Sequence, residues 1–342
     1  MADLIRVLVV DDSAFMRKAL SQEIASDARF TVVGTACDGK EGVKRALELQ
    51  PDVITLDVEM PVQDGLTTLR QLTPKCAAGI LMVSAATEAG AQITLDALSA
   101  GAIDFIPKSR GMAHLHEKLL AAAQVRQARS RSAAPGTPAA PVRVTQTSAL
   151  PAGFRPKAVI VGSSTGGPQA LTEFFTNMAP PLPVPVFVAQ HMPTPFTAAL
   201  AKRLTAQSGH NVTEAKDGEP IVNGRVYIGP GGFHLRMKDG AIRIHADVGE
   251  SLYQPSADVL AASALEEYGK NLIGVMFTGL GRDGTKEFTK LKNAGGWTIA
   301  QDAASCTVFG MPKSLIEAGG ASESMPPKMI GHRIEEILAG RR

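Results

Sequence analysis

The stretch Val159-Ile160-Val161-Gly162-Ser163-Ser164-Thr165-Gly166-Gly167-Pro168 runs from an apolar segment into a cluster of small residues and ends at a proline. A buried strand, a tight turn and a helix opened by the proline account for this order. Its five central residues match G-x-S-x-G, a pattern that presents serine as a nucleophile at a strand end. Similar glycine-rich turns bind phosphate or merely redirect the chain. The stretch predicts an α/β fold and makes Ser164 a candidate nucleophile, with both alternatives open.

Length and composition narrow the possible classes. The chain has 342 residues, enough for about two domains, with 44% hydrophobic and 20% charged residues. Its net charge of +2 argues against nucleic acid as a partner, and its three scattered cysteines form no CxxC pair. No signal peptide precedes the first apolar segment, and no apolar run reaches the roughly 20 residues of a membrane span. We expect a cytoplasmic protein that does not insert into membranes.

The first 125 residues alternate between apolar and amphipathic segments. The expected strands are Ile5–Val10, Thr31–Ala36, Val53–Asp57, Ile80–Ser84 and Ile103–Ile106. The expected helices cover about 13–25, 39–49, 65–72, 88–99 and 112–127. Five such units predict a doubly wound parallel sheet, in which ligands bind beyond the carboxyl ends of the strands.

Polar residues collect at those strand ends. They are Asp11, Asp12, Asp57, Ser84 and Lys108. Three neighbouring carboxylates repel one another unless a cation lies between them, and such an oxygen site suits Mg²⁺. The lysine and the hydroxyl could hold the oxygens of a phosphoryl group. A helix cap or a surface ion pair would explain any one of these residues, but not all five together.

The motifs around these residues resemble a response-regulator receiver domain of flavodoxin-like fold. They are Leu8–Ser13, Leu56–Pro61 with Asp64-Gly65, Val83–Ala85 and Phe105–Lys108. The resemblance implies that Asp57 accepts a phosphoryl group from a histidine kinase and that Ser84 and Lys108 sense it. It also implies an Mg²⁺ site made by Asp11, Asp12, Asp57 and the backbone carbonyl of Glu59. Ser109 stands where receivers usually have proline, which puts the customary cis bond after Lys108 in doubt.

Residues 126–154 are rich in alanine, proline and serine and lose all apolar periodicity. Such a segment buries too little surface to fold, so we expect a flexible linker. A second α/β domain is expected over 155–342. Its further strands are Val184–Gln190, Val226–Ile228, Asn271–Thr278 and Trp297–Gln301, with a hairpin of Phe233–Met237 and Ile242–His245. Its helices are expected at 168–178, 195–206, 257–268, 285–293 and 312–318.

A serine nucleophile needs a base and a group that orients the base. Of seven histidines, only His191 directly follows an apolar strand, and that strand comes next after the one before Ser164. Asp283 follows another apolar strand and a glycine-rich turn, and Asp302 is a weaker rival. The order Ser…His…Asp differs from that of α/β-hydrolases, chymotrypsin and subtilisin.

Three other functions fit the second domain less well. A dinucleotide site needs an acidic residue at the end of its second strand, where Gln190-His191 stands. A P-loop needs Gly-Lys-Ser/Thr, but Gln169 follows the glycines and Pro168. A DNA-binding domain would be short, helical and basic.

Seven motifs of the second domain resemble chemotaxis protein-glutamate methylesterases. They are 162–167, Gln190–Pro193, Gly218-Glu219, Tyr227–Gly231, Pro255–Leu260, Thr278–Gly284 and Ala300–Pro312. The resemblance places the family's catalytic residues on Ser164, His191 and Asp283. The backbone N–H groups of Thr165 and Leu280 would then form the oxyanion hole. The family often has alanine at Ser163 and methionine at Leu280.

The resemblance implies hydrolysis of glutamate γ-methyl esters on chemoreceptors with release of methanol, and deamidation of receptor glutamines. Phosphorylation of Asp57 would loosen a receiver that packs over the esterase site. We expect a monomer without a cofactor in the esterase site. The alternative is a phosphorylation-gated scaffold whose second domain has lost catalysis.

Overall fold

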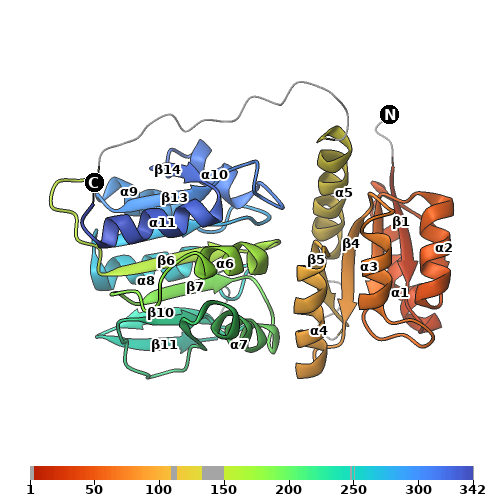
Figure 1. Cartoon of the computed structure of the whole chain (residues 1–342), viewed down its shortest axis with the longest axis horizontal. Helices are drawn as coiled ribbons and strands as arrows, with labels where there is room; N and C mark the ends of the chain where they lie inside the picture. Colours follow the sequence, from red (N-terminus) through yellow and green to blue (C-terminus); the bar gives the residue numbers. More distant parts are fainter. Residues whose placement is uncertain (1–3, 109–113, 133–149, 247–248, 250, 342) are drawn as a thin grey trace. The chain divides into compact units, whose positions relative to one another are not determined.

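The computed structural model describes residues 4–108, 114–132, 150–246, 249 and 251–341. It divides the chain into two compact units, Met1–Ala139 and Ala140–Arg342 (Figure 1). Within the described residues, no helix is both long enough and apolar enough to span a bilayer.

The first unit is built on a five-stranded parallel sheet in the order β2-β1-β3-β4-β5. Its strands are β1 (Ile5–Val10), β2 (Phe30–Ala36), β3 (Val53–Asp57), β4 (Gly79–Ser84) and β5 (Asp104–Pro107). The central strands β3 and β4 are buried along their whole length, which explains their continuous apolar sequence. The predicted doubly wound, flavodoxin-like fold is confirmed.

Helices cover both faces of this sheet. They are α1 (Ala14–Ala25), α2 (Gly39–Leu49), α3 (Gly65–Leu72), α4 (Glu88–Ser99) and α5 (Leu115–Ser132). Four of them begin at a polar cap that accepts a hydrogen bond from a backbone N–H in the first turn: Ser13, Asp38, Asp64 and Thr87. α1 and α5 pack with β1, β3 and β4 around one apolar core, and α2, α3 and α4 contact one another in sequence.

The helix α5 continues to Ser132, beyond the predicted helix end at 127 and into the segment expected to be a flexible linker from 126. Arg126, the first residue of that segment, forms an ion pair with Asp52. Arginine, glutamine and alanine favour helix, so composition alone did not show that the helix continues this far. Residues 133–149 of the expected linker lie outside the described residues.

The second unit contains a seven-stranded parallel sheet in the order β14-β13-β12-β6-β7-β9-β8. Its strands are β6 (Ala158–Ser163), β7 (Val186–Gln190), β8 (Asn211–Glu214), β9 (Arg225–Ile228), β12 (Leu272–Met276), β13 (Trp297–Gln301) and β14 (Glu323–Met325). β8 and β14, the two edge strands, are short and were not predicted. The opening stretch supplies β6, which lies at the centre of the sheet.

The expected hairpin is formed by the antiparallel strands β10 (His234–Lys238) and β11 (Ala241–His245). Asp239 and Gly240 connect them with positive φ angles of 52° and 70°, as a two-residue hairpin turn requires. The hairpin packs on α8 through its apolar side chains. A mostly parallel α/β domain with a β-hairpin is therefore confirmed.

In the described part of the second unit, six helices flank the seven-stranded sheet. They are α6 (Gly167–Thr176), α7 (Phe196–Ser208), α8 (Ala257–Tyr268), α9 (Thr285–Asn293), α10 (Met311–Glu317) and α11 (Pro327–Leu338). α6 contacts both α7 and α11, whereas α9 contacts both α8 and α10. These two groups of helices cover the opposite faces of the sheet (Figure 1).

Two glycines allow the turn between β6 and α6. Gly166 has a φ of +79°, and a Cβ there would lie 2.5 Å from the Thr307 side chain. A Cβ on Gly167 would lie 1.9 Å from Oε1 of Gln190. The backbone conformation and the close approach of these neighbours therefore exclude larger residues at both positions.

We predict that Phe174→Ala lowers the free energy of unfolding of the second unit by about 3–5 kcal/mol. Phe174 is fully buried on α6, with the rings of Phe175 and Phe277 centred 4.9 and 5.2 Å away, so its removal leaves a cavity. Urea unfolding followed by the fluorescence of Trp297, the only tryptophan, measures this unit. The control Met329→Ala, at a half-exposed site, should change the free energy by less than about 0.5 kcal/mol. Equal losses for the two variants would contradict the prediction.

Candidate active site

Ser164 lies directly after β6, in the turn that precedes α6. Its backbone N–H donates to the carbonyl of Thr278 (3.0 Å), and its carbonyl accepts from Nε2 of Gln190 (2.9 Å). Both partners are buried; Gln190 is the last residue of β7, and Thr278 lies two residues after the end of β12. Ser164 is half-buried and is not among the described non-glycine residues with positive φ. The turn therefore presents a serine at the sheet edge without the strained backbone of a nucleophile elbow.

His191 lies at the corresponding end of the adjacent strand. β6 pairs with β7 in parallel with Ser163 opposite Gln190, and the N–H of His191 donates to the carbonyl of Ser163 (3.0 Å). Ser164 and His191 are thus the next residues beyond two paired strands. The two strands, consecutive along the chain, are therefore also neighbours in the sheet.

The imidazole of His191 is bound by Asp283. Nε2 lies 2.7 Å from Oδ2 of this carboxylate, and the two side chains are only 8% and 6% exposed. Since an ionised carboxylate accepts hydrogen bonds, the proton of a neutral imidazole lies on Nε2 and the lone pair on Nδ1. Nδ1 is buried and has no hydrogen-bond partner among the described residues. It can accept a proton, as a general base must.

Asp283 is held at the N-terminus of α8. Its carboxylate accepts hydrogen bonds from the hydroxyl of Ser256 (2.7 Å), the cap of this helix, and from the backbone N–H groups of Ala257 (2.6 Å) and Asp258 (3.2 Å). Burial raises the pKa of Asp283, but the hydrogen bonds from His191, Ala257 and Ser256 outweigh it and bring this pKa below its ordinary value. The carboxylate therefore stays charged and orients the imidazole.

The rival acid, Asp302, is engaged elsewhere: its carboxylate accepts hydrogen bonds from the backbone N–H and the hydroxyl of Ser305.

The sequence did not indicate Ser256 and Tyr253 as residues of the site. Ser256 precedes a helical pattern and could have been read as a cap, whereas no sequence signal marks Tyr253 as a neighbour of His191. The ring of Tyr253 is stacked on the imidazole, with centroids 4.3 Å apart.

The glycine-rich turn after β12 lies against Ser164. A Cβ on Gly279 would be 2.6 Å from Cβ of Ser164, so only glycine allows this approach. The N–H of the next residue, Leu280, has no hydrogen-bond partner among the described residues. It is available to a ligand beside Ser164. No hydrogen bond joins the Ser164 hydroxyl to His191 in the described part of the chain.

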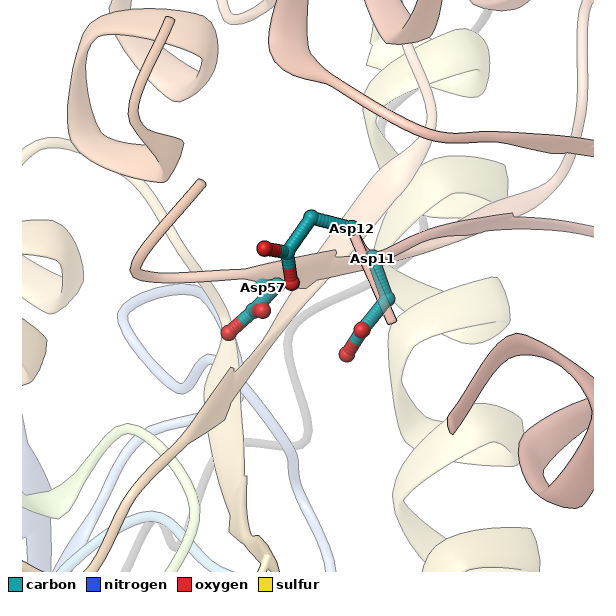
Figure 2. A group of neighbouring side chains, drawn as sticks. All are labelled: Asp11, Asp12 and Asp57. Carbon is teal, nitrogen blue, oxygen red and sulfur yellow. The ribbon is translucent and has the colours of Figure 1, made fainter. Parts of the chain in front are cut away.

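The first unit carries a separate group of charged residues. Asp11, Asp12 and Asp57 converge at the carboxyl ends of β1 and β3, as Figure 2 shows, and each offers a carboxylate oxygen within 4.8 Å of the others. Nζ of Lys108 lies 2.7 Å from Asp57 and 3.1 Å from Asp11. Four of the five predicted strand-end residues therefore meet at one point.

This group is short of positive charge. Burial raises the pKa of Asp57 to about 6; Lys108 opposes that shift and Asp11 adds to it. Burial lowers the pKa of Lys108, but its contacts with Asp57 and Asp11 hold it above the ordinary value. One lysine for three carboxylates leaves room for a hard divalent cation, and the oxygen donors fit Mg²⁺.

Ser84, the fifth predicted residue, is buried but bonded to α4 rather than to Asp57. Its hydroxyl accepts from Thr94 (2.9 Å) and lies 3.2–3.4 Å from the carbonyls of Ala85 and Gly90. Glu59, whose carbonyl was expected to bind the cation, lines a pocket together with Asp12. Ser109, at the bond after Lys108, lies outside the described residues.

Comparisons with known proteins agree for both units. A family model described as CheB methylesterase matches residues 159–334, and one described as response regulator receiver domain matches 7–120. A protein-glutamate methylesterase/protein-glutamine glutaminase of Symbiobacterium thermophilum is 42% identical, covering 98% of this chain and 97% of its own. Its Thermotoga maritima counterpart is also 42% identical, covering 98% and 99%. The crystal structure of the Thermotoga maritima CheB methylesterase catalytic domain matches 53% of this chain and 98% of its own, with a TM-score of 0.51 and 42% identity.

We predict that Asp57→Asn raises the melting temperature of the first unit at pH 7 without divalent cations. Because the folded pKa of Asp57 is raised to about 6, the folded state loses stability as pH rises from about 4 to 6, and asparagine removes that loss. The difference between variant and wild type should therefore shrink toward pH 4. Calorimetry measures the two melting temperatures. The transition of the first unit is the one that Trp297 fluorescence does not report.

The same variant tests the cation site. Adding Mg²⁺ should raise the melting temperature of the wild-type first unit more than that of Asp57→Asn, since a cation bound only by the folded state stabilises it. Equal gains would mean that Asp57 is not a ligand. This measurement does not depend on any catalytic activity.

Proposed function

This chain belongs to the family of CheB methylesterases with an N-terminal receiver domain, and from that premise we propose that Ser164, His191 and Asp283 carry its reaction. The enzyme demethylates glutamate γ-methyl esters on chemoreceptors in chemotactic adaptation. The observation that supports these three residues best is the orientation of the His191 imidazole. Asp283 contacts Nε2, and Nδ1 has no hydrogen-bond partner among the residues that the structure describes.

In the proposed first half-reaction, Nδ1 of His191 takes the proton of the Ser164 hydroxyl while the oxygen attacks the γ-carbonyl carbon of the ester. The backbone N–H groups of Thr165 and Leu280 stabilise the resulting oxyanion, a contribution worth about 10²–10³ in rate per donor. The tetrahedral intermediate collapses as the imidazolium returns its proton to the methoxy oxygen. Methanol leaves, and an acyl-enzyme on Ser164 remains.

In the second half-reaction, His191 takes a proton from water, and the hydroxide attacks the acyl carbon. The proton then returns to the Ser164 oxygen, which releases glutamate. Asp283 stabilises the imidazolium in both halves. With a glutamine side chain the same steps release ammonia, so one site serves as methylesterase and glutaminase. The chemistry of these residues calls for no cofactor.

We further propose that phosphorylation of Asp57 activates the esterase unit. Asp11, Asp12, Asp57 and the carbonyl of Glu59 would hold Mg²⁺, which supplies positive charge to the phosphoryl oxygens. Lys108 already contacts Asp57 and can hold the same oxygens. Ser84 would leave its contacts on α4 to meet the phosphoryl group, which adds charge and strong acceptors.

The proposed partners are a chemotaxis histidine kinase as phosphoryl donor and methyl-accepting chemoreceptors as substrates. A cytoplasmic location, a monomeric state and the lack of a nucleic-acid partner belong to the same proposal. The proposal also includes the domain boundaries, with the receiver at 1–125, the linker at 126–154 and the esterase at 155–342. A scaffold without catalysis is disfavoured, because relatives about 40% identical over nearly the whole chain bear enzyme names.

We predict that Ser164→Ala slows methanol release from methylated receptor at least about a thousandfold, because no other group can form the acyl-enzyme. Release is measured with receptor in membranes and wild-type enzyme in parallel. The control Ser208→Ala removes a hydroxyl that donates to the carbonyl of Leu204 and accepts from the N–H of His210 at the end of α7, and it should keep wild-type activity. Wild-type rates from Ser164→Ala would refute the nucleophile.

We also predict that Asp57→Asn keeps the basal methylesterase rate but is not activated by a histidine kinase with ATP and Mg²⁺. Asparagine has the size of aspartate but cannot form the acyl phosphate. The comparison is the ratio of rates with and without kinase for wild type and variant. Equal activation of both would overturn the assignment of Asp57.

A further inference from the structure

Tyr253 covers one face of the His191 imidazole. The two rings are almost parallel, with an interplanar angle of 3° and centroids 4.3 Å apart. The nitrogens at the edge of the imidazole are already assigned, since Nε2 contacts Asp283 and Nδ1 is the proposed base. The mechanism proposed for Ser164, His191 and Asp283 gives this stacked tyrosine no role.

Two contacts place Tyr253, one through its backbone and one at its phenol oxygen. Its backbone N–H donates to the hydroxyl of Ser251 (3.2 Å), and three residues later the chain reaches Ser256, which is bound to Asp283. At the other end of the ring, a Cβ on Gly281 would lie 3.1 Å from the phenol oxygen. The ring therefore occupies a defined place between the start of α8 and the glycine-rich turn.

An aromatic face carries partial negative charge and attracts a cation placed over it. A general base takes up a proton, so His191 in its proposed role becomes an imidazolium in the transition state. The attraction is larger for the charged form, so the stack lowers the barrier more than it stabilises the resting enzyme. The imidazole side chain is only 8% exposed, so water weakens this attraction little.

We propose that Tyr253 is a positioning residue that keeps the imidazole of His191 aligned between Asp283 and Ser164 and stabilises its protonated form during the reaction. This inference rests on the proposed role of His191 as the base. It requires the aromatic ring and does not require the phenol hydroxyl.

Other charged groups surround the same place. Asp283 faces Nε2, and a cleft of about 570 Å³ beside it is lined by Asp258, Arg282 and Lys286 as well as Tyr253. Asp258 is near enough to Asp283 for their charges to interact. These groups are the same in every Tyr253 variant, so a difference between the variants reports on the ring.

The test compares Tyr253→Phe with Tyr253→Leu by the pH dependence of kcat/KM for methanol release. Tyr253→Phe should match wild type. Tyr253→Leu should lower the plateau by about 2- to 30-fold and move the midpoint of the rising acid limb by about half a unit or more to lower pH. The midpoint falls because the imidazolium loses a stabilising neighbour. The neutral base then becomes available at lower pH.

A second readout needs no turnover. In Ser164→Ala protein, the NMR titration midpoint of the His191 ring should fall with Tyr253→Leu and stay unchanged with Tyr253→Phe. Leu252→Ala, which alters the neighbouring exposed residue, should also leave this midpoint unchanged. Trp297 fluorescence reports folding, and Tyr253→Met replaces Tyr253→Leu if the latter does not fold.

A lower plateau with unchanged midpoints in Tyr253→Leu would mean that the ring only packs, which overturns the proposal. Loss of activity in Tyr253→Phe equal to that in Tyr253→Leu would also overturn it, because the hydroxyl would then be responsible. Wild-type activity of His191→Ala would instead refute the proposed function. An inactive His191→Ala beside an unaltered Tyr253→Leu would refute this inference alone.

Discussion

The buried carboxylate of Asp283 accepts hydrogen bonds from His191, from Ser256 and from two backbone N–H groups at the start of α8. These contacts join the turn after β12, the end of β7 and the N-terminus of a helix. A buried carboxylate is costly unless its oxygens are satisfied, and here the helix end satisfies them. The rest of the site follows: the imidazole has one orientation, and Nδ1 is the nitrogen without a hydrogen-bond partner in the described part of the chain.

Both units follow the same rule of parallel sheets. Polar side chains that follow buried strands meet at the carboxyl edge, where loops are free to carry them. In the first unit this brings three carboxylates and Lys108 together, and burial, with the charge of Asp11 adding to it, raises the pKa of Asp57 to about 6. In the second unit it brings Ser164 and His191 to the ends of two paired strands. One unit can thus hold a charged modification and the other a nucleophile.

Strong apolar periodicity made most elements predictable. The boundaries of α4 and β13 agree with those expected, because each is set off by turn residues and a change of period. The edge strands β8 and β14 were missed, since they are short and only partly buried. The extension of α5 to Ser132 was missed because a helix of charged and small residues resembles a linker in composition. Prediction from the sequence fails in the same way wherever contacts with other parts of the chain, rather than the local pattern, decide the structure.

Residue type and place along the chain, read from the sequence alone, determined which side chains are candidates for the reaction. Ser164, His191 and Asp283 each follow a strand, and the carboxyl ends of parallel strands lie along the same edge of a sheet. Only the tertiary structure decided how these groups meet: which nitrogen of His191 faces Asp283, that Ser84 is bonded to α4, and that Tyr253 lies on the imidazole. The reason is physical. Strand ends are local in sequence, whereas loop conformation and ring orientation depend on packing and hydrogen bonds between residues that lie far apart along the chain.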